Sequence, residues 1–427
     1  MNPKRITNNL IKEEYFYLKH PSGLEVYVYP KKGYCSNYAI FGTNFGSINN
    51  KFKIKGHSSY TEVPDGIAHY LEHKLFAGKD GDAFELFSKT GASANAFTTF
   101  DKTAYLFSCA GNIEKPLEIL LDFVQTPYFT QENVDKERGI IAQEIKMYED
   151  SPDWKVFINL LQSLYQNNPV RIDTAGTVET IAKITPEILY NCYNTFYNLN
   201  NMCLCVVGDI NCDNILELVD KKVKYLPKIE VERFFPEEPN EVKNPKIVQK
   251  FDIENSMFSL GFKENVAPGE RISTAKSVSN DLILSCLSSS SSEMYEELVK
   301  KDLISMASFS DEYLEGPGYA SVIFSGESNN PEKASEVIKK HIEKIHKTGL
   351  DEKTFNRVKN AIYGQSLEIF NSVSSIAKSQ FNSAIARKEL FNYLETLQNI
   401  SIDKVNKDLE NKLNPNYSAL SIVSPKR

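Results

Sequence analysis

Two histidines and a glutamate lie within five residues of one another, at a spacing that suits a metal site. His69 and His73 are four positions apart, and Glu72 directly precedes the second histidine. In a helix, positions i and i+4 share a face, so both imidazoles can reach one ion while Glu72 stays near its water. Catalytic zinc keeps three protein ligands and one open position, and an adjacent carboxylate can act as general base. The pattern HxxEH is a metalloprotease motif and predicts zinc-dependent peptide hydrolysis, with an ordinary pair of surface histidines as the alternative.

The third zinc ligand is expected from a carboxylate further along the chain. Glu137 and Glu144 are seven positions apart, so both point to one side of a helix predicted at 132–149. Charged side chains on an apolar helix face are costly unless a partner compensates them, and a dication would do so. Glu149 is a second candidate, although it lies about 140° further round the helix, beside a sequence typical of a helix end. We favour Glu144 over Glu149.

Helices and strands predicted in the first half of the chain would bring these residues together. A helix is expected over 64–76, and a second helix over 82–90 ends at Gly91. The strands SANAFTTF and TAYLFSCA follow, and the strand CLCVVGD comes later. The alternation of Cys203 and Cys205 in CLCVVGD indicates buried strand residues rather than metal ligands. Further helices are expected over 114–124, 132–149, 154–165, 186–197 and 213–224.

The second half of the chain repeats the order of elements of the first half. Residues 227–247 contain four prolines and a dense cluster of charges, which is typical of a linker. It separates a catalytic zinc-binding domain, 1–226, from a homologous non-catalytic domain, 248–427. The predicted fold is α+β, with two similar domains that each pack several helices on an antiparallel-rich sheet. Beyond the linker, helices are expected among the strands IVQKFDI, SMFSLGF, ISMASFS, YASVIFSG and YSALSIVS.

Composition excludes some classes of partner and suggests a compartment. The formal net charge of −7 among 427 residues argues against nucleic acid or an anionic membrane as a partner. No apolar run is long enough for a membrane span. The N-terminal sequence has no apolar region typical of a secretory signal. The seven cysteines have no spacing typical of a disulfide framework, so we expect a reducing cytoplasm.

Four segments together resemble the pitrilysin/insulinase family of zinc metallopeptidases. They are GIAHYLEHKLF, GASANAFTTFDKTAYLF, ERGIIAQEIKMYEDSPDW and RIDTAGTVETI. The chain is especially similar to the bacterial half-length members related to the beta subunit of mitochondrial processing peptidase. The resemblance is strong over the first half and rests mainly on element order in the second. It implies half of a clamshell, formed by two similar domains.

The resemblance also implies a role for each residue of the site. His69, His73 and Glu144 would bind one Zn²⁺ per chain, Glu72 would be the base, and Glu137 would support the site. One departure is that the stretch from His73 to Glu144 is a few residues shorter than in the processing peptidases. A shortened loop around 77–82 would explain it, and this difference is why Glu149 stays open as the ligand.

A strand that could hold the substrate is also implied by the resemblance. Family members bind a peptide as an added strand at a sheet edge, where backbone pairing gives affinity and side-chain pockets select. An ordinary hairpin strand is the alternative. The matching residues here are Ser93, Ala94, Asn95, Ala96 and Phe97.

The second domain lacks residues that self-sufficient family members use to hold the substrate. An Arg and a Tyr seven residues later would fall here on Val299 and Met306, and neither side chain can donate a hydrogen bond. Lys300, Lys301 or Tyr313 could substitute only in part. The resemblance therefore implies a homologous partner chain that supplies the Arg and the Tyr. A heterodimer is expected, and a homodimer is less favoured.

These inferences lead to one main prediction of function. We expect a zinc endopeptidase of the bacterial cytoplasm that hydrolyses short or extended peptides in a closed chamber, as the metal-bearing subunit of a heterodimer. Two alternatives stay open: an inactive scaffold subunit with the same fold, and a binding protein with a structural zinc. Zinc content and hydrolysis of a quenched peptide would separate the three.

Overall fold

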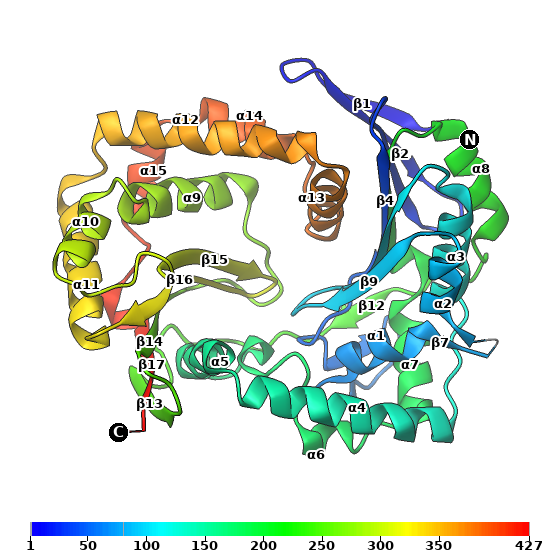
Figure 1. Cartoon of the computed structure of the whole chain (residues 1–427), viewed down its shortest axis with the longest axis horizontal. Coiled ribbons are helices and arrows are strands. Elements are labelled where there is room, and N and C mark those ends of the chain that lie inside the picture. Colours follow the sequence, from blue (N-terminus) through cyan, green and yellow to red (C-terminus); the bar gives the residue numbers. More distant parts are fainter. Residues whose placement is uncertain (1, 80, 427) are drawn as a thin grey trace. The chain divides into compact units, whose positions relative to one another are not determined.

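The computed structural model describes residues 2–79 and 81–426, which form two compact units (Figure 1). Each unit draws on segments that are far apart in the sequence. Unit 1 holds the chain up to Ile145, then Asp173–Phe234 and Ser366–Phe391, and unit 2 holds Lys146–Ile172, Phe235–Gln365 and the chain from Asn392.

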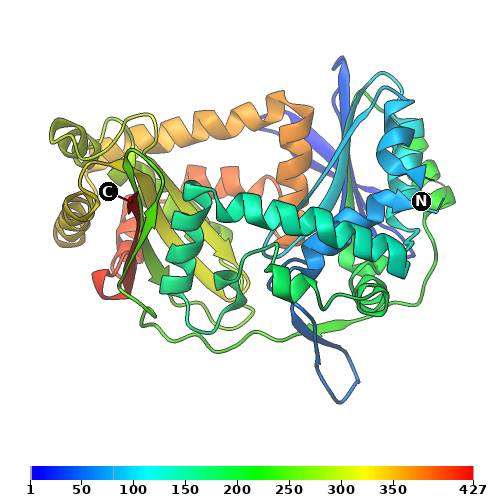
Figure 2. The ribbon, with the colours of Figure 1, turned by 60° about the horizontal axis from the view of Figure 1, so that its bottom comes forward.

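Unit 1 is built on a seven-stranded sheet with the strand order β1-β2-β3-β11-β4-β10-β9. Only β11 and β3 pair in parallel, and the other neighbours are antiparallel. The strands are β1 (Lys4–Asn8), β2 (Glu13–Lys19), β3 (Glu25–Pro30), β4 (Ser36–Thr43), β9 (Ser93–Thr98), β10 (Thr103–Ala110) and β11 (Met202–Gly208). A second sheet combines the hairpin of β5 (Lys51–Ile54) and β6 (Thr61–Glu62) with β12 (Val231–Arg233) (Figure 2). The short β7 (Ala77–Gly78) and β8 (Gly81–Asp82) pair with each other.

Helices cover both faces of the seven-stranded sheet. Successive side chains of a strand point to opposite faces, and apolar side chains occur on both faces of this sheet. Val26 and Val28 join the large core under the helices of one face, whereas Tyr27 between them belongs to the opposite face, where α13 (Val373–Ile385) packs on β4 and β11. The helices of the first face are α1 (Ile67–Phe76), α2 (Ala83–Ser88), α3 (Glu114–Val124), α4 (Gln131–Glu149), α6 (Val178–Ile181), α7 (Pro186–Phe196) and α8 (Cys212–Lys222).

Unit 2 has a five-stranded sheet in the order β13-β17-β14-β16-β15, with its own apolar core. The strands are β13 (Lys246–Phe251), β14 (Ser256–Glu264), β15 (Ser310–Gly316), β16 (Tyr319–Ser328) and β17 (Ser418–Pro425). Its helices include α5 (Pro152–Leu164), α9 (Thr274–Ser288), α10 (Glu293–Lys300), α11 (Pro331–Thr348), α12 (Glu352–Glu368), α14 (Asn392–Asn399) and α15 (Ile402–Leu409).

The two sheets follow one plan. The order β3-β11-β4-β10-β9 in unit 1 corresponds strand by strand to β13-β17-β14-β16-β15 in unit 2, with the same parallel pair and the same antiparallel pairs. The predicted α+β fold with two similar domains is therefore confirmed. The edge strand β15 is the counterpart of β9.

Each unit includes a long α-helix from the other half of the sequence. α5 precedes the predicted linker yet packs on β14 and β17, and α13 follows it yet packs on β4 and β11. Both contacts need a glycine, because a Cβ at Gly42 would lie 2.5 Å from Phe381, and a Cβ at Gly261 would lie 2.6 Å from Leu164. The boundaries 1–226, 227–247 and 248–427 describe the sequence halves and stay a prediction.

Most predicted elements of the first half occur with small shifts of their ends, and one strand of the second half does not. The helix expected over 64–76 begins at Ile67, and the strand with Cys203 and Cys205 is buried as expected. The segment ISMASFS, predicted as a strand, forms a turn over 304–309 in which Ser308 N–H donates to Ser305, and β15 begins after it. No helix within the described residues is long and apolar enough to cross a membrane.

Candidate zinc site

The start of α1 is fixed by a close backbone approach. Gly66 precedes the helix with φ of 90°, a conformation that favours glycine, and a Cβ there would lie 2.4 Å from the carbonyl oxygen of Ala175. Further along α1, the buried Tyr70 donates its hydroxyl hydrogen to the carbonyl of Val134 at the beginning of α4. These contacts set α1 against α4, the two helices that carry the predicted metal ligands.

His69, His73 and Glu144 come together where α1 and α4 face each other. One potential ligand atom from each of the three lies within 4.8 Å of the others. Glu144 Oε1 is 3.6 Å from His69 Nε2, and Glu144 Oε2 is 3.3 Å from His73 Nε2. Glu149, the alternative ligand, is an exposed residue at the end of α4 and is not part of this cluster. Two imidazoles and one carboxylate are the ligand set of many catalytic zinc sites, so the cluster fits zinc.

The two histidines differ in their affinity for protons. Burial, together with the nearby His73, lowers the pKa of His69 to about 4. Its Nδ1 is buried and has no hydrogen-bond partner among the described residues. Burial also opposes protonation of His73, but hydrogen bonds to Glu137 and Glu144 outweigh it and raise the pKa of His73 to about 9. Protonation of His73 and binding of a zinc ion at its Nε2 would therefore compete with each other.

Glu137 contacts the metal cluster from outside. Its Oε1 lies 3.1 Å from His73 Nδ1 and its Oε2 lies 3.8 Å from the buried Lys74 Nζ. Burial opposes ionisation of Glu137, but its interactions with His73 and Lys74 leave its pKa below the usual value. A carboxylate at Nδ1 holds the ring so that Nε2 faces the cluster, as is common for metal-binding histidines.

Glu72 lies beside the cluster and has a different hydrogen-bond partner from the other two glutamates. Its Oε2 accepts a hydrogen bond of 2.6 Å from the hydroxyl of Thr98, in β9. Burial raises the pKa of Glu72, although the hydrogen bond from Thr98 opposes this. The sequence did not single out Thr98, because nothing in the pair Thr98-Thr99 shows which hydroxyl faces α1.

The predicted substrate strand is the open edge of the seven-stranded sheet. β9 pairs with β10 on one side, and no other strand among the described residues pairs with it on the other side. The N–H of Ala96 donates to the side-chain oxygen of Asn95 at 2.8 Å, so it points away from β10. Because alternate residues of a strand present N–H groups to the same side, Ala94 and Thr98 share this direction. Ser93, Asn95 and Phe97 project toward the α13 face, where Phe97 contacts Phe381 at 6.4 Å between ring centres.

A cavity of about 410 Å³ joins this edge to the metal cluster. Glu72, His73 and Glu137 line it from α1 and α4, and Asn95 and Ala96 line it from β9. Apolar side chains, Phe76, Phe84 and Ile140, form another part of its wall. Glu72, His73 and the open strand edge thus share one space.

The two positions of unit 2 that align with a substrate-gripping Arg and Tyr do not form such a pair. Val299 is half-buried at the end of α10 and packs on the core of unit 2. Met306 lies in the turn before β15 and is 69% exposed.

The possible substitutes for the Arg and the Tyr are engaged elsewhere in unit 2. Lys300 and Lys301 each bind the glutamate four positions earlier, both at 2.6 Å. The hydroxyl of Tyr313 donates to Glu264 at 3.2 Å, and that carboxylate also binds Lys412 at 3.0 Å. The three side chains therefore have local partners within the described chain.

Comparisons with known proteins agree with this geometry. Residues 54–178 match the family model "Insulinase (Peptidase family M16)", and residues 183–362 match "Peptidase M16 inactive domain". A zinc protease of Bacillus subtilis, YmfH, is 38% identical over 427 residues, which cover 99% of both chains.

Two solved structures illustrate the similarity in three dimensions. A crystal structure described as an M16-like peptidase from Alicyclobacillus acidocaldarius has a TM-score of 0.92 and 32% identity, and covers 100% of this chain and 99% of the other. Pitrilysin matches with a TM-score of 0.79 over 100% of this chain but only 47% of its own. At 15% identity the match to pitrilysin shows the fold alone.

Proposed function

This chain belongs to the insulinase family of peptidases, family M16, and is a zinc protease; from that premise we propose that it hydrolyses extended peptides at the site between α1, α4 and β9. The observation that carries the proposal is the shared cavity. It brings Glu72 and His73 next to the open edge of β9, where a peptide backbone can pair. His69, His73 and Glu144 are proposed as the zinc ligands, one ion per chain.

Each residue has a proposed role in the reaction. Zinc at the three ligands would supply a Lewis acid, which lowers the pKa of water and polarises the peptide carbonyl. Glu72 takes the proton of the attacking water and passes it to the leaving amine. Burial raises the pKa of Glu72 and so makes it a stronger base, and Thr98 holds its carboxylate in place. Glu137 orients the His73 ring.

The substrate is proposed to bind as an additional strand on β9. The outward N–H groups of Ala94, Ala96 and Thr98 would pair with peptide carbonyls, and Asn95 would release the N–H of Ala96. Backbone pairing would accept any peptide in an extended conformation. A folded protein without a free extended segment could not pair with β9 and so would not be a substrate.

We propose further that the chain works with a homologous partner, in the bacterial cytoplasm. The partner is supported by Val299 and Met306, which offer no donor, and by the local pairing of Lys300, Lys301 and Tyr313. The cytoplasm is supported by the seven cysteines, all of which are free.

The Glu72→Gln variant tests the proposed chemistry. It removes the base and leaves the three ligands, so hydrolysis of a quenched peptide should fall on the order of a hundredfold or more while zinc content is unchanged. Glu132→Gln, at an exposed position of α4, is the control and should retain activity. Near-normal hydrolysis by the Glu72→Gln variant would show that Glu72 is not the base.

A further inference from the structure

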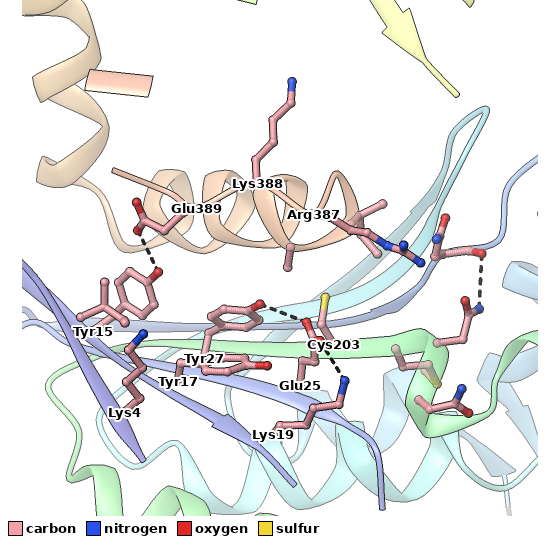
Figure 3. A pocket seen from close by; sticks show the side chains of 17 residues that line it. Lys4, Tyr15, Tyr17, Lys19, Glu25, Tyr27, Cys203, Arg387, Lys388 and Glu389 are labelled. Atoms are coloured by element: carbon pink, nitrogen blue, oxygen red, sulfur yellow. Dashed lines mark hydrogen bonds and ion pairs between the residues drawn. The ribbon is translucent and has the colours of Figure 1, made fainter. Parts of the chain in front are cut away.

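A second cavity, of about 620 Å³, lies in unit 1 away from the zinc site. Strands β2, β3 and β11 form its floor, and the end of α13 with the residues that follow forms its roof (Figure 3). It therefore belongs to the α13 face of the sheet, whereas the metal cluster lies on the opposite face. Its volume falls within the range of sites that hold small ligands or peptide side chains.

The floor of this cavity is aromatic. The rings of Tyr15 and Tyr17 lie 6.1 Å and 5.1 Å from the ring of Tyr27, and Figure 3 shows all three beneath the residues after α13. Tilted phenol rings offer an apolar or aromatic side chain a large contact area. The floor is therefore suited to a ligand with an apolar body.

The acidic groups of the cavity are already bound by its own residues. Tyr15 donates its hydroxyl hydrogen to Glu389 at 2.9 Å, and Tyr27 donates to Glu25 at 3.1 Å. Lys19 also binds Glu25, at 3.5 Å. The bond from Tyr15 to Glu389 ties the residues after α13 to the floor. Both carboxylates keep their charge, but the lining has four basic side chains against these two acidic ones: Lys4, Lys19, Arg387 and Lys388.

The basic groups of the cavity are more available than the acidic ones. Lys4 and Arg387 line it, and within residues 2–79 and 81–426 no hydrogen bond or ion pair engages either side-chain cation. Lys388 points away from the tyrosines (Figure 3). Figure 3 shows Lys4 at one end of the tyrosine floor and Arg387 at the other, so each is a separate position for an anionic group in a chain of net charge −7.

Arg387 occupies a backbone position that would suit glycine. Its φ is 57°, and its N–H donates to the carbonyl of Ala384 at 3.0 Å, which ends α13. A non-glycine residue is less stable than glycine in this left-handed conformation. A guanidinium is thus present at the mouth of the cavity although the fold itself favours glycine there.

We propose that this cavity is a second peptide-binding site, which takes an acidic segment of the substrate. A carboxylate of the peptide binds Arg387, a neighbouring apolar or aromatic side chain contacts the tyrosine floor, and Lys4 adds positive charge at the far end of the cavity. This inference rests on the proposed peptidase function and adds a preference among substrates to it.

The position of the cavity sets how far the acidic segment must lie from the cleaved bond. From β11 to β9 there are three strand spacings, about 14 Å. Because α13 packs on β4 and β11 between the two sites, the peptide must pass around a helix roughly 10–12 Å wide. About eight to ten extended residues span roughly 26–33 Å, which suffices.

Two labelled peptides test the preference by direct binding. Both carry a ten-residue spacer after the same cleavable segment, and one ends in Glu-Glu-Phe and the other in Gln-Gln-Phe. Fluorescence anisotropy with the full zinc-loaded chain should give about tenfold tighter binding of the Glu peptide, since charge-assisted hydrogen bonds are lost with Gln. Equal affinity for the two peptides would overturn the proposal.

Two glycine variants separate the cavity from general charge effects. Arg387→Gly removes the guanidinium and relieves the left-handed strain, so it should fold well and lose the preference for the Glu peptide. Lys12→Gly is matched to it, because Lys12 is an exposed cation with φ of 56° that does not line the cavity. It should keep the preference. Retention of the preference by Arg387→Gly would also overturn the proposal.

Hydrolysis of the same peptides distinguishes this proposal from the proposed function. The Arg387→Gly variant should raise KM for the Glu peptide to that of the Gln peptide, with kcat unchanged for both. Absence of hydrolysis of either peptide, even with a homologous partner, would contradict the peptidase function, whereas the anisotropy measurement would still decide whether the cavity binds acidic peptides.

Discussion

Three glutamates surround the two histidines, and their contacts give them different properties. Burial raises the pKa of Glu72, whereas the hydrogen bonds of His73 lower the pKa of Glu144 and help to lower that of Glu137. A carboxyl group with a raised pKa is suited to accept a proton, and carboxylates with lowered pKa values are suited to bind a cation or hold an imidazole. The same type of side chain is therefore suited to three different proposed roles, base, ligand and support, according to its neighbours.

Replacement of individual glutamates should separate the proposed ligand from its alternative. Glu144→Gln should lose zinc and activity, because it removes one of three ligands, whereas Glu149→Gln at the exposed end of α4 should be nearly neutral. Glu137→Gln should weaken zinc binding about 10–100-fold, as expected for an outer contact. Metal analysis of the purified variants measures this, and zinc loss from Glu149→Gln with retention in Glu144→Gln would reverse the assignment.

The proton on His73 predicts how zinc binding depends on pH. His73 has a pKa of about 9 and His69 of about 4, so between pH 6 and 8 zinc displaces one proton, from His73. The zinc dissociation constant should therefore fall about tenfold for each unit by which pH rises in this range. Competition with a chromophoric chelator at pH 6, 7 and 8 measures it. Glu137→Gln should make the dependence shallower by lowering the pKa of His73, and an affinity independent of pH would contradict the assignment.

At the residue scale the sequence predicted the cluster but not all of its neighbours. His69, Glu72 and His73 lie on one helical turn, where spacing alone determines which side chains share a face. Thr98 could not be found in this way, because its contact with Glu72 depends on how β9 packs on α1. Lys74 was missed for the same reason, since burial of a lysine beside Glu137 follows from tertiary packing.

At the element scale, β9 combines an open edge with a local hydrogen bond that partly protects it. An unpaired strand edge can pair with any extended chain, and natural proteins usually blunt such edges. Here Asn95 accepts the outward N–H of Ala96. This bond satisfies one backbone donor until a peptide carbonyl replaces it.

The Ala96→Pro variant should weaken peptide binding with little effect on zinc. Proline removes the outward N–H without breaking the pairing of β9 with β10, and proline is tolerated on an edge strand when its nitrogen faces outward. Loss of one backbone hydrogen bond of about 0.5–1.5 kcal/mol should raise KM roughly three- to tenfold. Peptide kinetics and zinc content check this, with thermal unfolding as the control for stability. An unchanged KM would argue against strand addition at β9.

Elements with strong local signals were the ones that the sequence predicted best. The helix over 114–124 and the hairpin around Asp101 occur where they were expected, because periodic apolar residues and turn residues specify them locally. The strand predicted at ISMASFS was wrong. Its apolar residues are spaced like those of a strand, but the N–H groups of Ser308 and Phe309 donate to the carbonyl of Ser305, and this turn delays the strand until Ser310.

At the scale of the whole molecule, the second domain keeps the plan of the first without its chemistry. α9 follows the second strand of the plan, as α1 does in unit 1, and contains no histidine. The second domain also has Val299 and Met306 at the positions of the Arg and the Tyr that would hold the substrate and the oxyanion. Because loss of a single oxyanion donor costs 10²–10³ in rate, the isolated chain should hydrolyse a quenched peptide about a hundredfold more slowly than a complete site. Mixing with a homologous chain that carries the Arg and Tyr should restore activity. Full activity alone, unchanged on mixing, would contradict the heterodimer.

The exchange of helices between the two sequence halves could not be predicted from the sequence. Both α5 and α13 are amphipathic, and an amphipathic pattern shows that a helix has a buried face without showing which sheet will cover it. The close approach of these helices depends on Gly42 and Gly261, which lie in strands. A glycine in a strand can also mark a bulge or a bend, so it does not by itself predict that a helix packs there. Only the three-dimensional structure shows which sheet each helix covers.

That exchange also determines when unit 1 can finish folding while the chain is being synthesised. The segments of unit 1 up to Phe234 leave the ribosome first, but α13 belongs to a segment that ends about 160 residues later, at Phe391. At about 5–20 residues per second, the sheet waits roughly 10–30 s with the α13 face of β4 and β11 uncovered. The nascent enzyme thus spends part of its synthesis with an apolar surface available to chaperones, and the zinc-binding unit is completed only when nearly the whole chain has been made.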